Sequence, residues 1–162
     1  MKVCVFAGTF DPLTNGHKFV IDTCLKMFDK VVVAIGVNVD QSPMFSLDKR
    51  KQMILDTYSG ETRVDVKEFD GLLTDFMKNN GNTINVRGIR DMDDYKYETT
   101  MERYNRDMLE DLITIYIPTP KDLVQVSSKA IRNIIQLNGD CSKYLPSQVN
   151  EFILQEKRLK TN

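Results

Sequence analysis

The chain has 162 residues, of which 41% are hydrophobic and 28% charged. A chain of this size can bury roughly two thirds of the surface that its unfolded form exposes, which predicts a single domain over residues 1–162. Its 22 basic residues nearly cancel its 23 acidic ones, and this balance excludes a broad basic face for nucleic acid or an anionic membrane. A local basic pocket is still compatible with the composition.

The three cysteines, Cys4, Cys24 and Cys141, are odd in number and far apart in the sequence. Their spacing excludes CxxC metal and redox motifs and argues against the disulfide framework of a secreted protein. The apolar run at residues 3–7 is too short for a signal peptide, and no later run approaches the ~20 apolar residues of a membrane span. We therefore expect a soluble protein of the reducing cytoplasm.

Apolar and β-branched runs that end in turn residues predict strands at residues 2–7, 31–37, 63–69, 83–86 and 112–117. The second run is continuously apolar, which is typical of a strand buried on both faces of a parallel sheet. The third run alternates and is expected nearer an edge. Helical patterns lie between and after these strands, at residues 20–28, after Ser46 as an N-cap, and at residues 72–79, 93–109, 129–137 and 147–157.

Alternation of strands and helices predicts an α/β fold with a doubly wound, five-stranded parallel sheet. Ligands of such sheets bind at the carboxyl ends of the strands, near the point where the strand order switches. In the fourth predicted helix, Tyr97, Met101, Tyr104 and Met108 recur at helical spacing and share one face. This stripe favours a core or subunit-interface role over contact with a cofactor.

The chain has one histidine, His17, which excludes a zinc site with two histidines. Residues 8–17 read GTFDPLTNGH and form a predicted strand-to-helix loop, with Gly16 and His17 at the helix N-terminus. Free N–H groups and the helix dipole favour a phosphate there. On these residues alone, a histidine next to a glycine is more often a helix cap or a surface residue than a phosphate ligand.

Two further segments carry groups suited to phosphates. Arg87 and Arg90 flank Gly88 at the end of the fourth predicted strand, where they can bind a polyphosphate or form an ion-pair cluster with nearby acidic residues. Ser127 and Ser128 open the fifth predicted helix as ordinary N-caps or as phosphate-binding hydroxyls.

These segments resemble the nucleotidyltransferase superfamily with an (H/T)xGH motif, which here reads Thr14-Asn15-Gly16-His17. Within it, the GTFDPxTNGH form is similar to the phosphopantetheine adenylyltransferase family. The RGxR, D-Y/F-x-Y-E and ISSTxxR-like elements follow in the family's order over nearly the whole chain, and residues 139–146 resemble its G-D-x-S-x-x-L-P turn, to which we assign a structural role.

The resemblance implies a Rossmann-like nucleotidyltransferase fold and adenylyl transfer from ATP to 4′-phosphopantetheine, giving dephospho-coenzyme A and pyrophosphate. It implies Mg²⁺ that arrives with ATP rather than on protein ligands, coenzyme A as an inhibitor, and a homo-hexamer. It assigns catalysis to His17 as transition-state stabiliser, with Thr9 and Arg90. The implied ATP contacts are Thr9, Phe10, His17, Gly88, Ile89, Arg90, Glu98, Leu123, Val124, Gln125, Val126, Ser127, Ser128 and Lys129. The implied acceptor contacts are Thr9, Gln41, Leu73 and Arg87.

One position departs from the family pattern: Gln41 stands where the family has a lysine that binds substrate and transition state. Glutamine donates hydrogen bonds but carries no charge, so Lys49 or Lys129 is a candidate to supply it. The departure leaves transfer to another phosphorylated acceptor open. A nucleotide-binding subunit that has lost catalysis is a second alternative, whereas a flavodoxin-like carrier lacks matching loop chemistry.

Overall fold

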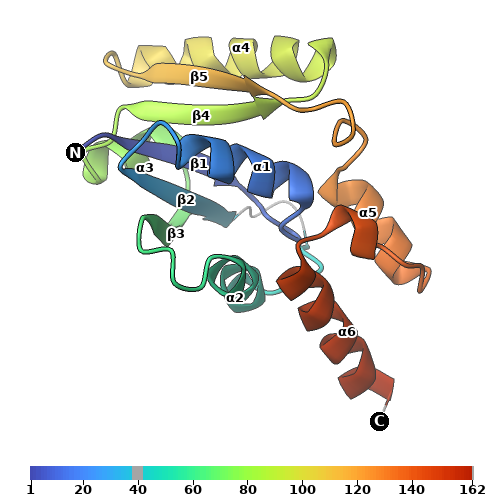
Figure 1. Cartoon of the computed structure of the whole chain (residues 1–162). Helices are drawn as coiled ribbons and strands as arrows, with labels where there is room; N and C mark the ends of the chain where they lie inside the picture. The colour runs from blue at the N-terminus through green and yellow to red at the C-terminus, as the bar shows by residue number, and fades with distance from the viewer. Residues whose placement is uncertain (38–41, 162) are drawn as a thin grey trace.

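Five parallel strands form one sheet in the computed structural model, which describes residues 1–37 and 42–161. The strands lie in the order β3-β2-β1-β4-β5 (Figure 1). Their bounds are β1 (Val3–Gly8), β2 (Lys30–Val37), β3 (Val64–Asp70), β4 (Ile84–Ile89) and β5 (Ile113–Pro118). The chain builds outward from β1 to β3 and then crosses back to β4, so the switch in strand order lies between β1 and β4. This arrangement confirms the predicted doubly wound α/β class.

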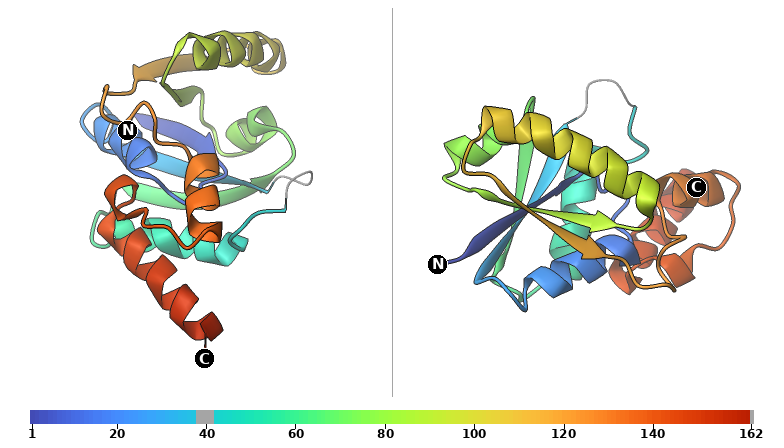
Figure 2. Two further views of the ribbon diagram at one scale, coloured as in Figure 1. Left: turned by 90° about the vertical axis from the view of Figure 1, so that its right-hand side faces the viewer. Right: turned by 90° about the horizontal axis from the view of Figure 1, so that it is seen from above.

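Six α-helices and one short 3₁₀ helix accompany the sheet in the described part of the chain. They are α1 (Asn15–Cys24), α2 (Leu47–Thr57), α3 (Leu73–Asn79), α4 (Met92–Met108), α5 (Ser128–Gln136), η1 (Ser142–Tyr144) and α6 (Ser147–Thr161). In Figure 2, α3 and α4 lie on one side of the sheet and α1 on the other. Within residues 1–37 and 42–161, none of the helices combines the length and apolar character that a bilayer crossing needs.

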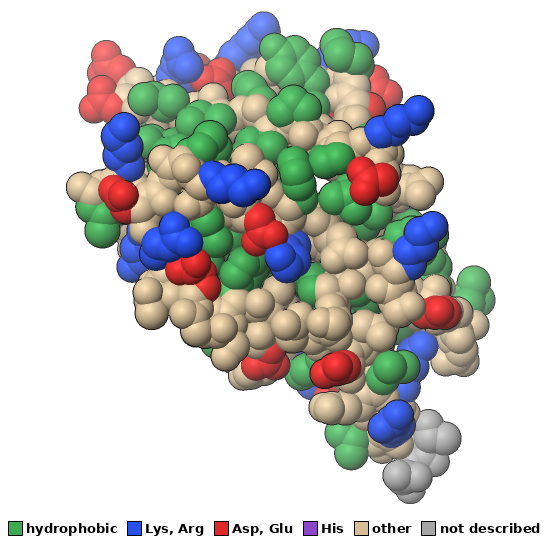
Figure 3. Space-filling view, viewed as in Figure 1, with side chains coloured by type: hydrophobic (Ala, Val, Ile, Leu, Met, Phe, Trp, Pro, Cys, Tyr) green, Lys and Arg blue, Asp and Glu red, His purple; other side chains and the backbone are tan. Residues whose placement is uncertain are grey.

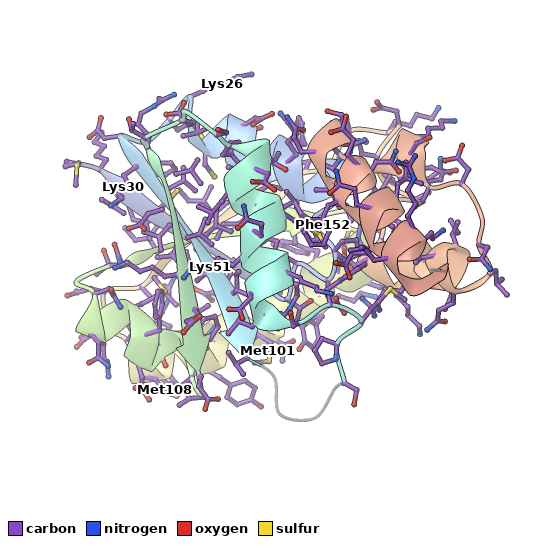
Figure 4. All side chains as sticks on the ribbon, turned by 90° about the horizontal axis from the view of Figure 1, so that it is seen from below. Lys26, Lys30, Lys51, Met101, Met108 and Phe152 are labelled. Atoms are coloured by element: carbon purple, nitrogen blue, oxygen red, sulfur yellow. The ribbon has the colours of Figure 1, made fainter. Side chains whose placement is uncertain are left out.

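The two faces of the sheet each bury a separate apolar cluster. Alternate residues of β1 point to opposite faces, so that Cys4 and Phe6 join one cluster while Val5 and Ala7 join the other. The first cluster is the larger and packs α1, α2, α5 and α6 against the sheet, with Phe152 of α6 lying between α6 and α2 (Figure 4). The C-terminal helices are therefore anchored to the same side of the sheet as α1.

The strand β4 is longer than its sequence predicts. The prediction ends it at residue 86 because an arginine and a glycine follow, whereas the ladder to β5 continues through Arg87↔Tyr116 to Ile89↔Pro118. Pairing with β5 satisfies the backbone groups of residues 87–89, which the prediction places after the strand. Arg87 and Gly88 therefore lie on a strand, and their positions are fixed by the sheet.

The helix α4 does not bury the stripe that its spacing defines. None of its residues is buried, and Tyr97, Met101 and Tyr104 are 63%, 37% and 60% exposed. The core interpretation is therefore wrong for these three residues of the single chain, because α4 covers the edge of the sheet. The subunit-interface interpretation stays a prediction. Figure 3 shows hydrophobic side chains along the upper end of the molecule, where α4 and β5 lie.

Candidate active site

A cleft of about 460 Å³ opens at the carboxyl edge of the sheet, beside the switch between β1 and β4. It is bordered by the ends of β1 and β4 and by the starts of α1, α4 and α5. The structure thus brings together the three segments that the sequence singled out for phosphate chemistry. The predicted site residues that line it are Thr9, His17, Arg87, Gly88, Arg90, Glu98, Leu123, Val126, Ser127, Ser128 and Lys129.

Other predicted site residues do not line this cleft: Phe10, Ile89, Val124, Gln125 and Leu73. The ring of Phe10 is fully buried, with its centroid 5.4 Å from that of Phe6 and 5.0 Å from that of His17, so only its backbone can approach a nucleotide. Leu73 packs at the start of α3 against the second apolar cluster. Gln41 lies outside the described residues.

His17 occupies the third position of α1 and forms a capping box with Thr14. The Thr14 hydroxyl accepts from the His17 backbone N–H at 3.3 Å, and the Thr14 backbone N–H donates to His17 Nδ1 at 3.1 Å. Because Nδ1 accepts this bond, the neutral ring carries its proton on Nε2. The cap and phosphate-donor interpretations of His17 are therefore compatible, since they use different nitrogens.

The cleft keeps His17 uncharged. Burial, together with the positive charges of Arg87 and Arg90, lowers the pKa of its imidazole from 6.5 to about 4. At neutral pH the ring is thus a neutral hydrogen-bond donor. It can bind a phosphate oxygen without having to exchange a proton.

Arg87 and Arg90 are each paired with a carboxylate of α4. Arg87 donates from Nε and Nη2 to Glu98 at 2.8 and 2.5 Å, and from Nη1 to the Ala7 carbonyl at 2.7 Å. Arg90 donates from Nε and Nη2 to Asp94 at 2.8 and 3.1 Å, and this pair lowers the pKa of the Asp94 carboxyl. The predicted ion-pair cluster therefore exists, and it lies within the cleft.

The N-terminus of α5 forms the opposite side of the cleft. Ser127 caps the helix by accepting from the Ala130 N–H at 3.2 Å, and the Ser128 hydroxyl donates to the Pro12 carbonyl at 3.0 Å. Both hydroxyls thus have protein partners, while the first N–H groups of the helix remain the donors suited to phosphate oxygens. Lys129 is exposed at the rim.

The two candidate replacements for the missing lysine are placed differently. Lys49 lies on α2, does not line the cleft, and forms an ion pair with Glu156 of α6. The expectation that Lys49 supplies the charge therefore has no support in the geometry. Lys129 lines the cleft and remains a candidate.

Sequence reasoning assigned no role to two charged residues that line the cleft. Asp94 holds Arg90, and Arg132 of α5 donates from Nη1 to the Asp11 carbonyl at 2.7 Å. The signal for both lay in the motifs already identified, because Asp94 opens the D-Y/F-x-Y-E element and Arg132 closes the ISSTxxR-like element.

The comparisons with known proteins agree with this geometry. The Cytidylyltransferase-like family matches residues 5–134. A phosphopantetheine adenylyltransferase of Anaeromyxobacter sp. (strain K) is 35% identical over 152 residues, covering 94% of this chain and 93% of the relative. One of Bordetella avium (strain 197N) is 38% identical over 154 residues, covering 94% and 92%. This chain belongs to the phosphopantetheine adenylyltransferase family.

Solved structures show that this family member shares its fold with other adenylyltransferases. A putative nicotinate-nucleotide adenylyltransferase from Vibrio parahaemolyticus superposes with a TM-score of 0.71 at 22% identity, over 96% of this chain and 94% of that one. A bifunctional NMN adenylyltransferase/ADP ribose pyrophosphatase from Francisella tularensis gives 0.75 at 19% identity, over 96% and 49%. At these identities the likeness establishes the nucleotidyltransferase fold alone, whereas membership of the phosphopantetheine adenylyltransferase family rests on sequence.

Proposed function

We propose that this chain transfers the adenylyl group of ATP to 4′-phosphopantetheine, releasing pyrophosphate and forming dephospho-coenzyme A. The observation that carries the proposal is the single cleft in which His17, Arg87, Arg90 and the α5 N-terminus meet. This set of donors surrounds one volume large enough for a polyphosphate and an acceptor phosphate. Near full-length similarity to phosphopantetheine adenylyltransferases supports the choice of substrates.

The reaction is an in-line displacement at the α-phosphorus of ATP. An oxygen of the acceptor phosphate forms a bond to that phosphorus while the bond from the phosphorus to the pyrophosphate oxygen breaks. The nucleophile is already an anion, so the protein needs no general base. Its task is to position two anions and to stabilise the charge that grows on the α-phosphate oxygens.

Each side of the cleft has a part in this reaction. We assign the α-phosphate to His17 Nε2, whose neutral donor needs no proton transfer, together with Thr9. The β- and γ-phosphates are assigned to Arg90, the α5 N–H groups and Lys129, because these groups supply donors and charge at the cleft. Arg87, which lines the cleft, is assigned to the acceptor. Leu73 and Gln41 are assigned to it by the family resemblance alone, since Leu73 does not line the cleft and Gln41 lies outside the described residues.

Mg²⁺ belongs in this proposal to the nucleotide. Within the described residues no group of three or more His, Cys, Asp and Glu side chains is arranged to hold a metal ion, and the cleft carboxylates Asp94 and Glu98 are paired with arginines. These residues do not fit a resident ion. ATP phosphates supply oxygen ligands of the kind that Mg²⁺ prefers.

The remaining expectations extend this proposal. We expect coenzyme A to inhibit, because it carries the same pantetheine arm as the acceptor. A homo-hexamer is supported by the exposed apolar side chains of Tyr97, Met101 and Tyr104, which a partner subunit would cover. We place the reaction in the cytoplasm, since Cys4, Cys24 and Cys141 are free thiols.

The test is pyrophosphate release from ATP or CTP with a panel of phosphorylated acceptors that includes 4′-phosphopantetheine and nicotinamide mononucleotide. We expect release with ATP and 4′-phosphopantetheine only. Release with another acceptor would move the chain to a different branch of the superfamily. Binding of ATP without release for any acceptor would identify a nucleotide-binding subunit that has lost catalysis.

A further inference from the structure

Arg50 of α2 is a buried arginine for which the reaction above has no role. Only 4% of the residue is exposed, yet its guanidinium lies close to the carboxyl edge of the sheet. Its Nη1 donates to the Thr9 carbonyl at 2.7 Å, and its Nε donates to the Phe45 carbonyl at 3.2 Å. Burial lowers the pKa of the Arg50 guanidinium, and this effect outweighs the negative charge of Asp11, which raises the pKa. A buried cation is costly unless its donors are satisfied, so these carbonyls are tightly bound partners.

The hydrogen bonds of Arg50 connect two segments of the chain, the loop after β1 and the segment before α2. Thr9 follows β1 and lines the main cleft, whereas Phe45 precedes α2. Asp11 strengthens the same junction, because its carboxylate accepts from the Met44 and Phe45 N–H groups, each at 2.9 Å. Arg50 and Asp11 therefore hold the loop after β1 against the segment that leads into α2 through four hydrogen bonds.

The bond to the Thr9 carbonyl also fixes the direction of the next N–H group. Thr9 borders both the main cleft and a smaller hollow of about 40 Å³, while Arg50 borders only the smaller one. The carbonyl of Thr9 therefore faces the hollow. In the trans peptide between Thr9 and Phe10, the N–H points opposite to the C=O, which directs the Phe10 N–H away from Arg50 and the hollow.

Phe10 itself is held in an unusual conformation. Its φ of 49° lies in the left-handed region, which a bulky side chain adopts only where its surroundings impose it. The buried ring is anchored against His17, and the preceding carbonyl is anchored by Arg50. The two contacts therefore hold both the Phe10 ring and the peptide that precedes it.

We propose that Arg50 is a positioning residue for adenylyl transfer, which binds the Thr9 carbonyl and thereby aims the Phe10 N–H at the nucleotide phosphates. Arg50 touches no substrate and acts through this peptide. The inference rests on the proposed function for its effect on rate. Its structural part, the response of one amide to nucleotide, can be measured without turnover.

The experiment compares Arg50→Lys with the wild-type protein and with Lys51→Met, which removes a cation from the next position of α2. Lysine keeps the charge but cannot bind the Thr9 and Phe45 carbonyls together through one planar fork. The protein is labelled with ¹⁵N-phenylalanine, so its eight phenylalanines give eight amide signals. The non-hydrolysable analogue α,β-methylene-ATP is titrated with Mg²⁺, and kcat and KM are measured by pyrophosphate release.

We expect the Phe10 amide signal to shift with the analogue in the wild type and in Lys51→Met, and to lose most of that shift in Arg50→Lys. We expect kcat of Arg50→Lys to fall by about ten- to a hundredfold, with the acceptor KM changed less than about twofold. This loss is smaller than the ~10²–10³-fold that follows removal of a preorganised donor, because Arg50→Lys displaces the Phe10 N–H without removing it. Arg50→Met, which removes the charge as well, should show the same loss of the amide response where it folds. If Arg50→Met does not fold, the result for Arg50→Lys alone tests the inference.

A folded Arg50→Lys protein with a wild-type amide response and wild-type kcat overturns the inference while the proposed function stands. A wild-type protein that releases no pyrophosphate, but whose Phe10 signal responds to nucleotide and loses this response in Arg50→Lys, gives the reverse result. The proposed function then fails and the positioning role of Arg50 holds. The inference is also overturned if the Phe10 amide signal of an active wild-type protein does not shift when the nucleotide analogue is added.

Discussion

The cleft has two walls whose phosphate-binding groups have different hydrogen-bond partners within the protein. The first, here called the loop wall, consists of residues 8–17 and 126–132. In it, the side chains of Arg50, Arg132 and Ser128 donate to the backbone carbonyls of Thr9, Asp11 and Pro12. The second, the α4 wall, consists of residues 87–98, and its arginines are bound bidentately by Glu98 and Asp94.

The difference separates preorganised donors from neutralised charges. In the loop wall, internal hydrogen bonds occupy these carbonyls, while the first N–H groups of α5 and His17 Nε2 are left as donors for a ligand. In the α4 wall, a phosphate must share or displace a carboxylate that already matches the guanidinium fork. We therefore expect substitutions in the loop wall to lower kcat most, and substitutions in the α4 wall to raise KM.

The largest expected effect follows removal of the His17 donor. We expect His17→Ala to lower kcat by on the order of a hundredfold or more, as loss of a preorganised donor to a transition state does. Because His17 Nδ1 also caps α1, His17→Asn is the matched variant. Its Oδ1 can accept from the Thr14 N–H, but it has no group in the place of Nε2.

Pyrophosphate release and thermal unfolding of both variants check this prediction. We expect His17→Asn to lose as much kcat as His17→Ala while unfolding at a temperature closer to that of the wild type. Near-normal turnover in a folded His17→Asn protein would contradict both the role of Nε2 and the stronger role of the loop wall.

A smaller effect is expected at Arg90 on the α4 wall. Arg90→Lys keeps the positive charge but loses the bidentate fork, so the KM for ATP should rise about tenfold with a smaller change in kcat. Arg63→Lys is the control, because Arg63 pairs with Glu61 at the exposed end that precedes β3. Steady-state kinetics with varied ATP measures the effect. A larger loss of kcat in Arg90→Lys than in His17→Asn would reverse the comparison of the walls.

The sequence was sufficient for the fold class and for most of the cleft. Continuous apolar runs such as residues 31–35 identify buried parallel strands, and such sheets collect their loops at one edge, where the predicted phosphate segments meet. The sequence could not show the continuation of β4 through Arg87 and Gly88, because that strand is extended by pairing with β5. Local propensity carries no information about such a partner.

Other features were missed for a different physical reason. Arg50 binds backbone carbonyls, which every residue has, so no sequence pattern marks its partners. The stripe on α4 has the same spacing whether it faces a core or a second subunit, and only the structure shows that Tyr97 and Tyr104 are exposed. Lys49 could be excluded from the site only once its pairing with Glu156 was seen.

A few-fold effect is expected where the sequence departs from its family. Gln41→Lys should lower the KM for 4′-phosphopantetheine or raise kcat, because it adds a positive charge at a position implied to face the acceptor. A solvent-screened pair of opposite charges contributes up to about 1 kcal/mol, which corresponds to about a fivefold change. Steady-state kinetics with varied acceptor, in the presence and absence of Lys129→Met, measures it. A neutral or harmful Gln41→Lys would show that another cation already serves, and in that case Lys129→Met alone should lower activity.

The smallest effect on activity, and the sharpest check on the loop wall, is the titration of His17. Its pKa of about 4 in the folded protein lies below the ordinary 6.5, so the unfolded chain takes up the proton first as the pH falls. The contribution of His17 to stability is therefore complete above pH 6.5 and declines as the pH falls from there toward 4.

The single histidine makes this measurement direct, because one ring gives one set of NMR signals. The ring should not titrate between pH 8 and 5.5 in the folded protein, kcat should show no inflection from His17 in that range, and the ring should titrate near 6.5 in urea. A folded-state midpoint near 6.5 would mean that His17 is a solvated, chargeable group. The loop wall would then resemble the α4 wall, offering a charge to the phosphates in place of a fixed neutral donor.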